Sequence, residues 1–194
     1  MFVRWTPVDD GFLDVATSLR AIARYGVGYD NIDLAATAAR GIPVCNVQGY
    51  ANHSVSDHAL ALILACVRGL RTGMEQLRPK YAAPAHAHMP ELHEMTLGIV
   101  GLGRIGGTLC TKSRGLFHRV IACDPYIPPE RFIDLGTDAC SLEKLLQSSD
   151  VVSLHCNLTE ETHQLIGEKT LNMMRPNAIL INTSRGPVVD EDAL

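Results

Sequence analysis

Short apolar segments alternate with segments of helical periodicity along most of this 194-residue chain. The apolar segments predict strands at 2–5, 19–24, 42–47, 97–100, 120–123, 150–155 and 178–182. Helices are predicted at 30–40, 58–73, 129–135, 142–148 and 168–174, a further helical pattern follows 101–106, and another helix opens at 190. This alternation is typical of an α/β protein built on parallel sheets.

The longest predicted helix, 58–73, has Ser54 or Ser56 as its expected N-cap. Apolar residues lie nearly all round this helix, and such a helix is buried on several sides, at a domain junction or a subunit interface. We therefore expect a homodimer formed through the region 54–73. The segment 81–91 contains two prolines and several alanines without periodicity, which indicates a connecting loop.

Three glycines, Gly101, Gly103 and Gly106, stand between an apolar strand and a helix in the segment TLGIVGLGRIG (96–106). Gly101 permits a tight turn, Gly103 allows backbone N–H groups to approach a phosphate, and Gly106 allows close packing of helix on strand. The positive end of the helix would face the pyrophosphate of a dinucleotide.

An acidic residue, Asp124, ends the next apolar strand, 18 residues after the last glycine. A carboxylate at about this spacing accepts hydrogen bonds from the adenosine ribose and repels a 2′-phosphate, which favours NAD over NADP. The alternative is a glycine turn in some other α/β domain; the flanking strands and the acidic residue argue against it.

The formal net charge is −4 and 46% of the residues are hydrophobic. These values favour a sizeable core and exclude the basic face of a protein that binds nucleic acid or an anionic membrane. The longest apolar run, 59–67, is too short to span a bilayer, and residues 1–4 do not resemble the start of a signal peptide. Six cysteines without a CxxC pair indicate reduced thiols and a cytoplasmic location.

No metal site is expected among the histidines. His53 and His58 are five residues apart, which misses the spacing of a pair on one helix face. His86, His88 and His93 lie in an irregular segment without matching cysteines or carboxylates. We interpret His155 as a residue at the end of a strand, facing the cofactor edge, rather than as an acid–base group.

Seven motifs carry a resemblance to a known family. They are YGVGYDNIDLAAT (25–37), GIPVCNV (41–47), SVSDHALALILACVR (54–68), TLGIVGLGRIG (96–106), DPY (124–126), SDVVSLHCNLTEETHQLIG (149–167) and MRPNAILINTSRGPVVDEDAL (174–194). In this order they resemble the D-isomer-specific 2-hydroxyacid dehydrogenases. The resemblance implies a doubly wound parallel-sheet (Rossmann) NAD-binding domain over 53–194. It also implies an incomplete flavodoxin-like substrate-binding domain over 1–52.

The reaction implied is hydride transfer between C4 of nicotinamide and C2 of a 2-hydroxy or 2-keto acid. By the same resemblance Arg185 is the catalytic arginine, which binds the substrate carboxylate through two hydrogen bonds and polarises the keto oxygen. Val27 and Gly28 belong to a loop that donates backbone N–H groups to that carboxylate, and Val27 also lies near the nicotinamide. Further residues implied in cofactor binding are Arg104, Ile105, Cys156, Thr183 and Ser184.

Two expectations concern segments that the resemblance implies but the 194 residues would lack. The family's acid–base histidine and its supporting glutamate follow the catalytic arginine, so turnover is expected to be impaired. The first strand of the substrate domain is also expected to be missing. It would be an interior strand, so residues 1–50 would be poorly held.

Two alternatives stay open at this point. One is an NAD(H)-sensing binding protein, similar to the C-terminal-binding-protein corepressors, which share several of these motifs. The other is an inactive fragment. The motifs leave the identity of the 2-hydroxy acid undecided, although the lack of a basic cluster near Gly26–Gly28 or 47–52 argues weakly against a phosphorylated substrate.

Overall fold

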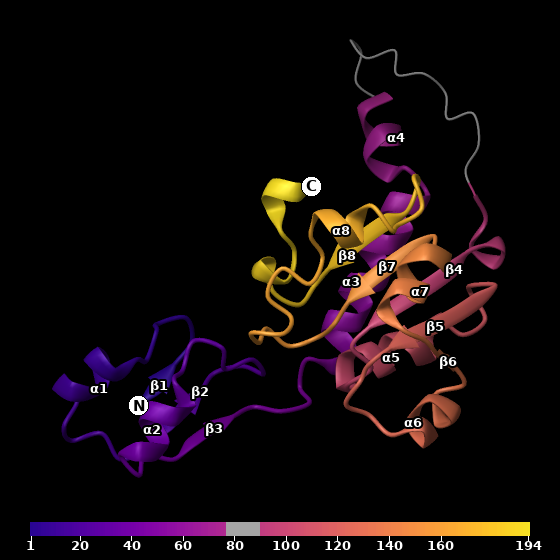
Figure 1. Ribbon diagram of the computed structural model, residues 1–194. Coiled ribbons are helices and arrows are strands. Elements are labelled where there is room, and N and C mark those ends of the chain that lie inside the picture. Colours follow the sequence, from indigo (N-terminus) through magenta and orange to yellow (C-terminus); the bar gives the residue numbers. More distant parts are fainter. Residues whose placement is uncertain (77–89) are drawn as a thin grey trace. The chain divides into compact units, whose positions relative to one another are not determined.

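The structure is a computed structural model that describes residues 1–76 and 90–194 (Figure 1). The chain divides into two compact units, Met1–Ala51 and Asn52–Leu194. Most of the predicted loop 81–91 falls outside the described residues, as do His86 and His88.

The first unit is a three-stranded parallel sheet with two short helices. Its elements are β1 (Phe2–Val3), α1 (Asp10–Val15), β2 (Ile22–Arg24), α2 (Leu34–Ala39) and β3 (Val44–Asn46). The strands are neighbours in chain order, β1-β2-β3. The buried core consists of Val3, Val8, Leu13, Ile22, Ile32, Ala36 and Ile42.

Helix α1 was missed by the sequence analysis. Asp9 caps the helix by accepting a hydrogen bond of 2.9 Å from the backbone N–H of Phe12. The helix forms the crossover between β1 and β2, whose register pairs Val3 with Arg24. These strands are therefore direct neighbours, with no place between them for a missing interior strand. That residues 1–50 are poorly held stays a prediction.

The second unit contains a five-stranded parallel sheet with helices on both faces (Figure 1). Its helices are α3 (Asn52–Val67), α4 (Leu70–Gln76), α5 (Arg104–Ser113), α6 (Pro129–Asp134), α7 (Leu142–Ser148) and α8 (Glu168–Leu171). Its strands are β4 (Thr96–Val100), β5 (Arg119–Cys123), β6 (Asp138–Ala139), β7 (Val151–Leu154) and β8 (Ile179–Asn182). Short 3₁₀ turns lie at Leu92–Glu94, Gly186–Val188 and Glu191–Ala193.

The strand order is β6-β5-β4-β7-β8. The chain therefore winds outward from β4 to one edge, returns, and winds outward from β7 to the other edge. This is the doubly wound order, in which ligands bind at the carboxyl ends of the two central strands. The Rossmann fold predicted from the sequence is confirmed, and its switch point lies between β4 and β7.

Both faces of the sheet are covered, which explains the nearly continuous apolar sequence of β4 and β7. On one face, Leu97, Ile99 and Ile181 share a core with α3 and α5. On the other face, Val152 and Leu154 share a core with α7. The sheet is thus held rigidly from both sides, and its carboxyl edge is a fixed platform for a site.

The long helix differs from its prediction at both ends. Helix α3 begins at Asn52, before Ser54 and Ser56, so neither serine is the cap; Ser56 lies buried in the first turns and donates to the carbonyl of His53 at 3.0 Å. The helix ends at Val67, and Gly69, with a φ of 56°, separates it from α4. The buried face of α3 repeats at helical spacing, through Ser56, Ala59, Ile63 and Val67.

Gly98 lies where β4 packs closely against α7, so a substitution there measures how tight this packing is. A Cβ at this position would lie 2.6 Å from Leu145 Cδ2, in the middle of β4. We expect Gly98→Ala to lower the free energy of unfolding by about 2 kcal/mol through overpacking. The measurement is urea denaturation.

The matched control is Gly73→Ala in α4, where no described atom lies within 4 Å of the new Cβ. This change is expected to be neutral or to stabilise by up to about 1 kcal/mol, because alanine is the better helix former. Equal effects of the two substitutions would contradict the packing described.

Candidate functional site

The turn between β4 and α5 is built from glycines for steric reasons. Gly101 has a φ of 88°, and its N–H donates to the carbonyl of Cys123 at 2.9 Å. A Cβ on Gly101 would lie 2.6 Å from the backbone nitrogen of Cys156 and 2.8 Å from the carbonyl carbon of His155. The turn therefore packs backbone against backbone at the end of β7, and it tolerates no side chain at Gly101.

The other two glycines have different environments. A Cβ on Gly106 would overlap the carbonyl oxygen of Gly101, so Gly106 allows α5 to approach the turn closely. Gly103, the N-cap of α5, is exposed, and no described atom lies within 4 Å of where its Cβ would be. The structure thus leaves one side of the turn open.

The N-terminus of α5 faces this open side and suits an anion. Within the described residues, no side chain caps this ten-residue helix, and its first turn contains no acidic residue. Its first N–H groups lack partners inside the helix, and the helix dipole adds positive potential there. The turn and the helix end together fit the pyrophosphate of a dinucleotide. Arg104 and Ile105 form the start of this helix.

Asp124 is held directly over the turn. Its Oδ2 accepts a hydrogen bond of 2.8 Å from the N–H of Leu102, and its Oδ1 accepts one of 3.0 Å from the N–H of Tyr126. Each carboxylate oxygen accepts more than one hydrogen bond, so both can also receive a ribose hydroxyl. The acidic residue and the glycine turn predicted from the sequence are therefore brought together.

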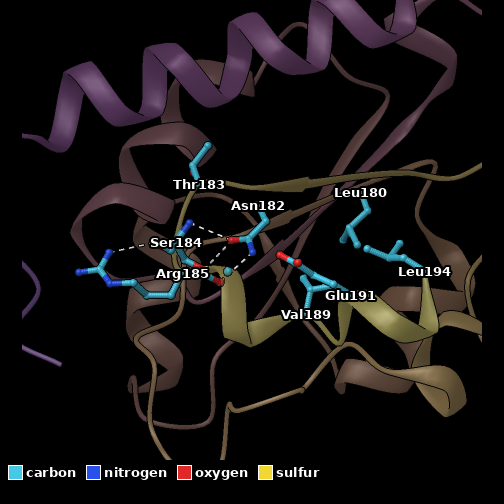
Figure 2. Close-up of a pocket in the computed structure, with 9 residues that line it drawn as sticks. Leu180, Asn182, Thr183, Ser184, Arg185, Val189, Glu191 and Leu194 are labelled. Atoms are coloured by element: carbon cyan, nitrogen blue, oxygen red, sulfur yellow. Dashed lines mark hydrogen bonds between the residues drawn. The ribbon is translucent and has the colours of Figure 1, made fainter. Parts of the chain in front are cut away.

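Beyond β8, Asn182 organises the loop that carries the candidate catalytic arginine. Its Oδ1 accepts from the N–H and the hydroxyl of Ser184, at 3.0 and 2.8 Å, and its Nδ2 donates to the carbonyl of Arg185 at 2.8 Å (Figure 2). The sequence analysis did not single out Asn182, although asparagine followed by Thr183 and Ser184 after a strand is typical of such turns.

This loop borders a cavity of about 390 Å³. Its lining consists of Leu180, Asn182, Thr183, Ser184, Arg185, Gly186, Val189, Glu191 and Leu194. Figure 2 shows the Arg185 side chain extending away from Leu180 and Leu194, while Thr183 points toward the side of the sheet covered by α3. Arg185 also donates from Nη1 to the carbonyl of Ser184 at 2.9 Å.

His155 and Cys156 lie between the glycine turn and this loop. Burial alone lowers the pKa of His155 to about 4, so its imidazole is neutral near pH 7. The ring contacts Ser153 Oγ at 2.9 Å and Thr183 Oγ1 at 3.5 Å. Burial also raises the pKa of the Cys156 thiol, which is therefore neutral near pH 7.

Val27 and Gly28 belong to the first unit, in a loop after β2. Asn46 Nδ2 donates to the carbonyl of Val27 at 2.6 Å, and the N–H of Val47 donates to the carbonyl of Gly26 at 3.1 Å. The loop is thus attached to the end of β3. Its role in substrate binding stays a prediction.

Two arginines beside this loop correct the view that no basic cluster lies near Gly26–Gly28. Arg24 is 95% buried, against Gly26, and its guanidinium lies 5.3 Å from the Trp5 ring centre. Arg4 lies 5.4 Å from the same ring, because the register of β1 and β2 places the two arginines close together. They are 20 residues apart in sequence, which concealed the cluster. The sequence argument against a phosphorylated substrate no longer holds.

Comparison with known proteins identifies the family. The profile described as "D-isomer specific 2-hydroxyacid dehydrogenase, NAD binding domain" matches residues 60–194. The chain belongs to this family. Residues 60–194 are accordingly its NAD-binding domain, in agreement with the doubly wound sheet and the glycine turn.

Members of the 2-hydroxyacid dehydrogenase family are similar over nearly the whole chain. A glyoxylate reductase of Korarchaeum cryptofilum is 41% identical over 192 residues, covering 97% of this chain and 58% of that protein. A D-3-phosphoglycerate dehydrogenase of Mycobacterium tuberculosis is 39% identical over 189 residues, covering 97% and 36%. The chain thus spans less than two thirds of the length of these relatives.

Solved structures of known proteins show the same similarity. The D-lactate dehydrogenase of Aquifex aeolicus, crystallised with NAD and lactic acid, superposes with a TM-score of 0.92 at 32% identity, covering 99% of this chain and 58% of that one. In the part of the chain that the structure describes, no helix is long and apolar enough to cross a membrane. The same residues contain no cluster of three metal-ligating side chains.

The buried imidazole of His155 makes stability depend on pH. Its pKa of about 4 in the folded state lies below the 6.5 of a free histidine, so the unfolded chain binds the proton first as pH falls. This contribution to stability, about 3 kcal/mol, is complete above pH 6.5 and is lost progressively as the pH falls to 4. Urea denaturation at pH 7, 6 and 5 measures it.

The His155→Gln variant cannot titrate, so its stability should fall less steeply over this range. His118→Gln, which changes an exposed histidine of the same unit, should leave the wild-type slope unchanged. The attribution to His155 would be lost if the wild type and His155→Gln showed the same slope.

Proposed function

We propose that this chain forms the cofactor-binding part, and some of the substrate-binding part, of an NAD-dependent oxidoreductase. The reaction is hydride transfer between nicotinamide and C2 of a 2-hydroxy or 2-keto acid. The main support is the placement of Asp124, whose carboxylate is hydrogen-bonded to the glycine turn beside the open end of α5.

In this proposal, different residues at the carboxyl edge of the sheet bind different parts of the cofactor. The α5 N-terminus, with Arg104 and Ile105, binds the pyrophosphate, and Asp124 binds the adenosine ribose. Cys156, Thr183 and Ser184 line the path toward the nicotinamide, which supplies the hydride donor or acceptor when bound. A carboxylate at Asp124 disfavours the 2′-phosphate of NADP.

Substrate-binding roles are proposed for residues in each unit. Arg185 is positioned by Asn182 and holds the substrate carboxylate while polarising the keto oxygen. Val27 and Gly28 contribute backbone N–H groups. We assign residues 1–52 to the substrate-binding domain and 53–194 to the cofactor domain, close to the observed division at Ala51.

The enzymatic role is favoured over the NAD(H)-sensing alternative by the relatives at 39 to 42% identity. They are named glyoxylate reductases and D-3-phosphoglycerate dehydrogenases. The inactive-fragment alternative predicts that the chain does not bind the cofactor. Cofactor binding can be measured directly. Six free thiols support a location in the cytoplasm.

Asp124→Ala tests cofactor binding. Removal of a carboxylate that accepts from the ribose should weaken NADH binding about tenfold or more, because hydrogen bonds to charged groups are among the stronger ones. It should also reduce the preference for NADH over NADPH. Isothermal titration calorimetry measures both affinities.

Asp134→Ala, which removes an exposed carboxylate of α6, serves as the control and should bind NADH like the wild type. Equal NADH affinities of Asp124→Ala and the wild type would refute the assigned role of Asp124. Lack of NADH binding by the wild-type chain would instead support the inactive fragment.

We also propose a homodimer formed through the region 54–73 and its continuation in α4. Leu70 and Met74 are 55% and 70% exposed, and they extend the apolar sequence of α3 beyond Gly69. Met74→Glu should shift the molecular mass in solution toward that of the monomer, as measured by size-exclusion chromatography with light scattering.

The control is Ile133→Glu, at an exposed apolar residue of α6 that is 77% exposed. It should leave the mass unchanged. A wild-type chain that is monomeric at all concentrations would refute the proposed dimer.

A further inference from the structure

His155 lies between the glycine turn after β4 and the loop after β8 that carries Arg185. The register pairs Leu154 with Asn182, so the next residues along these parallel strands, His155 and Thr183, are neighbours. Side chains alternate along a strand, so Ser153 and His155 face the same side of the sheet.

The backbone of His155 packs against the glycine turn. Its N–H donates to the carbonyl of Val100 at 2.7 Å, at the end of β4. Its carbonyl carbon lies where a Cβ on Gly101 would collide. The side chain, in contrast, reaches toward β8.

The imidazole uses both ring nitrogens. Nε2 lies 2.9 Å from Ser153 Oγ, a fully buried hydroxyl, and Nδ1 lies 3.5 Å from Thr183 Oγ1. The second distance is long, as is common for site hydrogen bonds without a ligand, which tighten in the complex. A neutral ring can donate from one nitrogen and accept at the other.

We propose that His155 is a positioning residue for cofactor binding, whose neutral imidazole fixes Thr183 relative to the glycine turn. This inference rests on the proposed function, because Thr183 is assigned there to the nicotinamide path. Thr183 is followed directly by Ser184 and Arg185, so its position also sets where the catalytic loop begins.

The surroundings keep the ring neutral. Burial is the cause of its lowered pKa, and within the described residues no charged group contributes to the shift. A neutral ring holds Thr183 through a directional hydrogen bond without adding a charge beside the nicotinamide.

A double-mutant cycle tests the link. Each of His155→Phe, which keeps a ring of similar size, and Thr183→Val should weaken NAD binding about fivefold. If His155 acts through Thr183, the double variant should be no weaker than the worse single variant. His155→Asn, whose side-chain amide mimics Nδ1, should bind NAD within about twofold of the wild type.

Ser153→Ala separates positioning from stability. It removes the buried partner of Nε2, so it should lower the urea midpoint while leaving NAD affinity unchanged. Additive losses in the double-mutant cycle, or NAD affinities that follow the urea midpoints across all four single variants, would overturn the proposal.

A readout without cofactor keeps this test independent of the proposed function. In the apo protein, the amide of Thr183 should exchange with solvent faster in His155→Phe than in His155→Asn, as followed by NMR. Unchanged exchange in both variants would refute the link to Thr183 even if NAD binds. If the two variants show the exchange difference but the wild type binds no NAD, the proposed function is refuted instead.

Discussion

The candidate site depends on the close approach of two backbone segments, the turn at Gly101 and the peptide between His155 and Cys156. A side chain at Gly101 would force β4 and β7 apart at their carboxyl ends. These are the central strands of the doubly wound sheet, where the chain reverses its winding. The contact at this point is between main chains, so it leaves no room for a side chain at Gly101.

The polar groups of the crevice are attached to this framework. Asp124 accepts a hydrogen bond from the turn itself, Asn182 holds the loop around Arg185, and no side chain caps the N-terminus of α5 within the described residues. Asp124 and Asn182 are therefore oriented by hydrogen bonds to the main chain. Such preorganisation is what electrostatic recognition and catalysis require.

The fold of the second unit could be predicted from the sequence because its signals are local. The apolar strands, the glycine turn and the N-cap of α7 each lie within a few residues; this cap, Ser141, accepts from the N–H of Lys144 at 3.2 Å. The start of α3 was placed wrongly because two serines resembled caps, whereas Ser56 is buried under Lys112, whose Nζ lies 2.8 Å from its hydroxyl. That partner is 56 residues away.

In the first unit, too, contacts between residues far apart in sequence could not be predicted from local patterns. Asp9 could have been identified as the cap of α1, but the proximity of Arg4 and Arg24 to the same Trp5 ring depends on the strand register, which no local pattern encodes. Within the candidate site, Asp124 was found by its spacing from the glycines. Asn182 was overlooked because its contacts appear once the loop is folded back on itself.

The distribution of cysteines has a practical consequence. Burial raises the pKa of Cys110, Cys123, Cys140 and Cys156, so these thiols stay protonated and react slowly with alkylating reagents. Of the six cysteines, Cys45 and Cys66 are the two exposed ones, and each unit carries one of them. The natural sequence therefore offers one attachment point per unit for a pair of spectroscopic labels, so the spacing of the two units in solution can be measured without engineering new thiols.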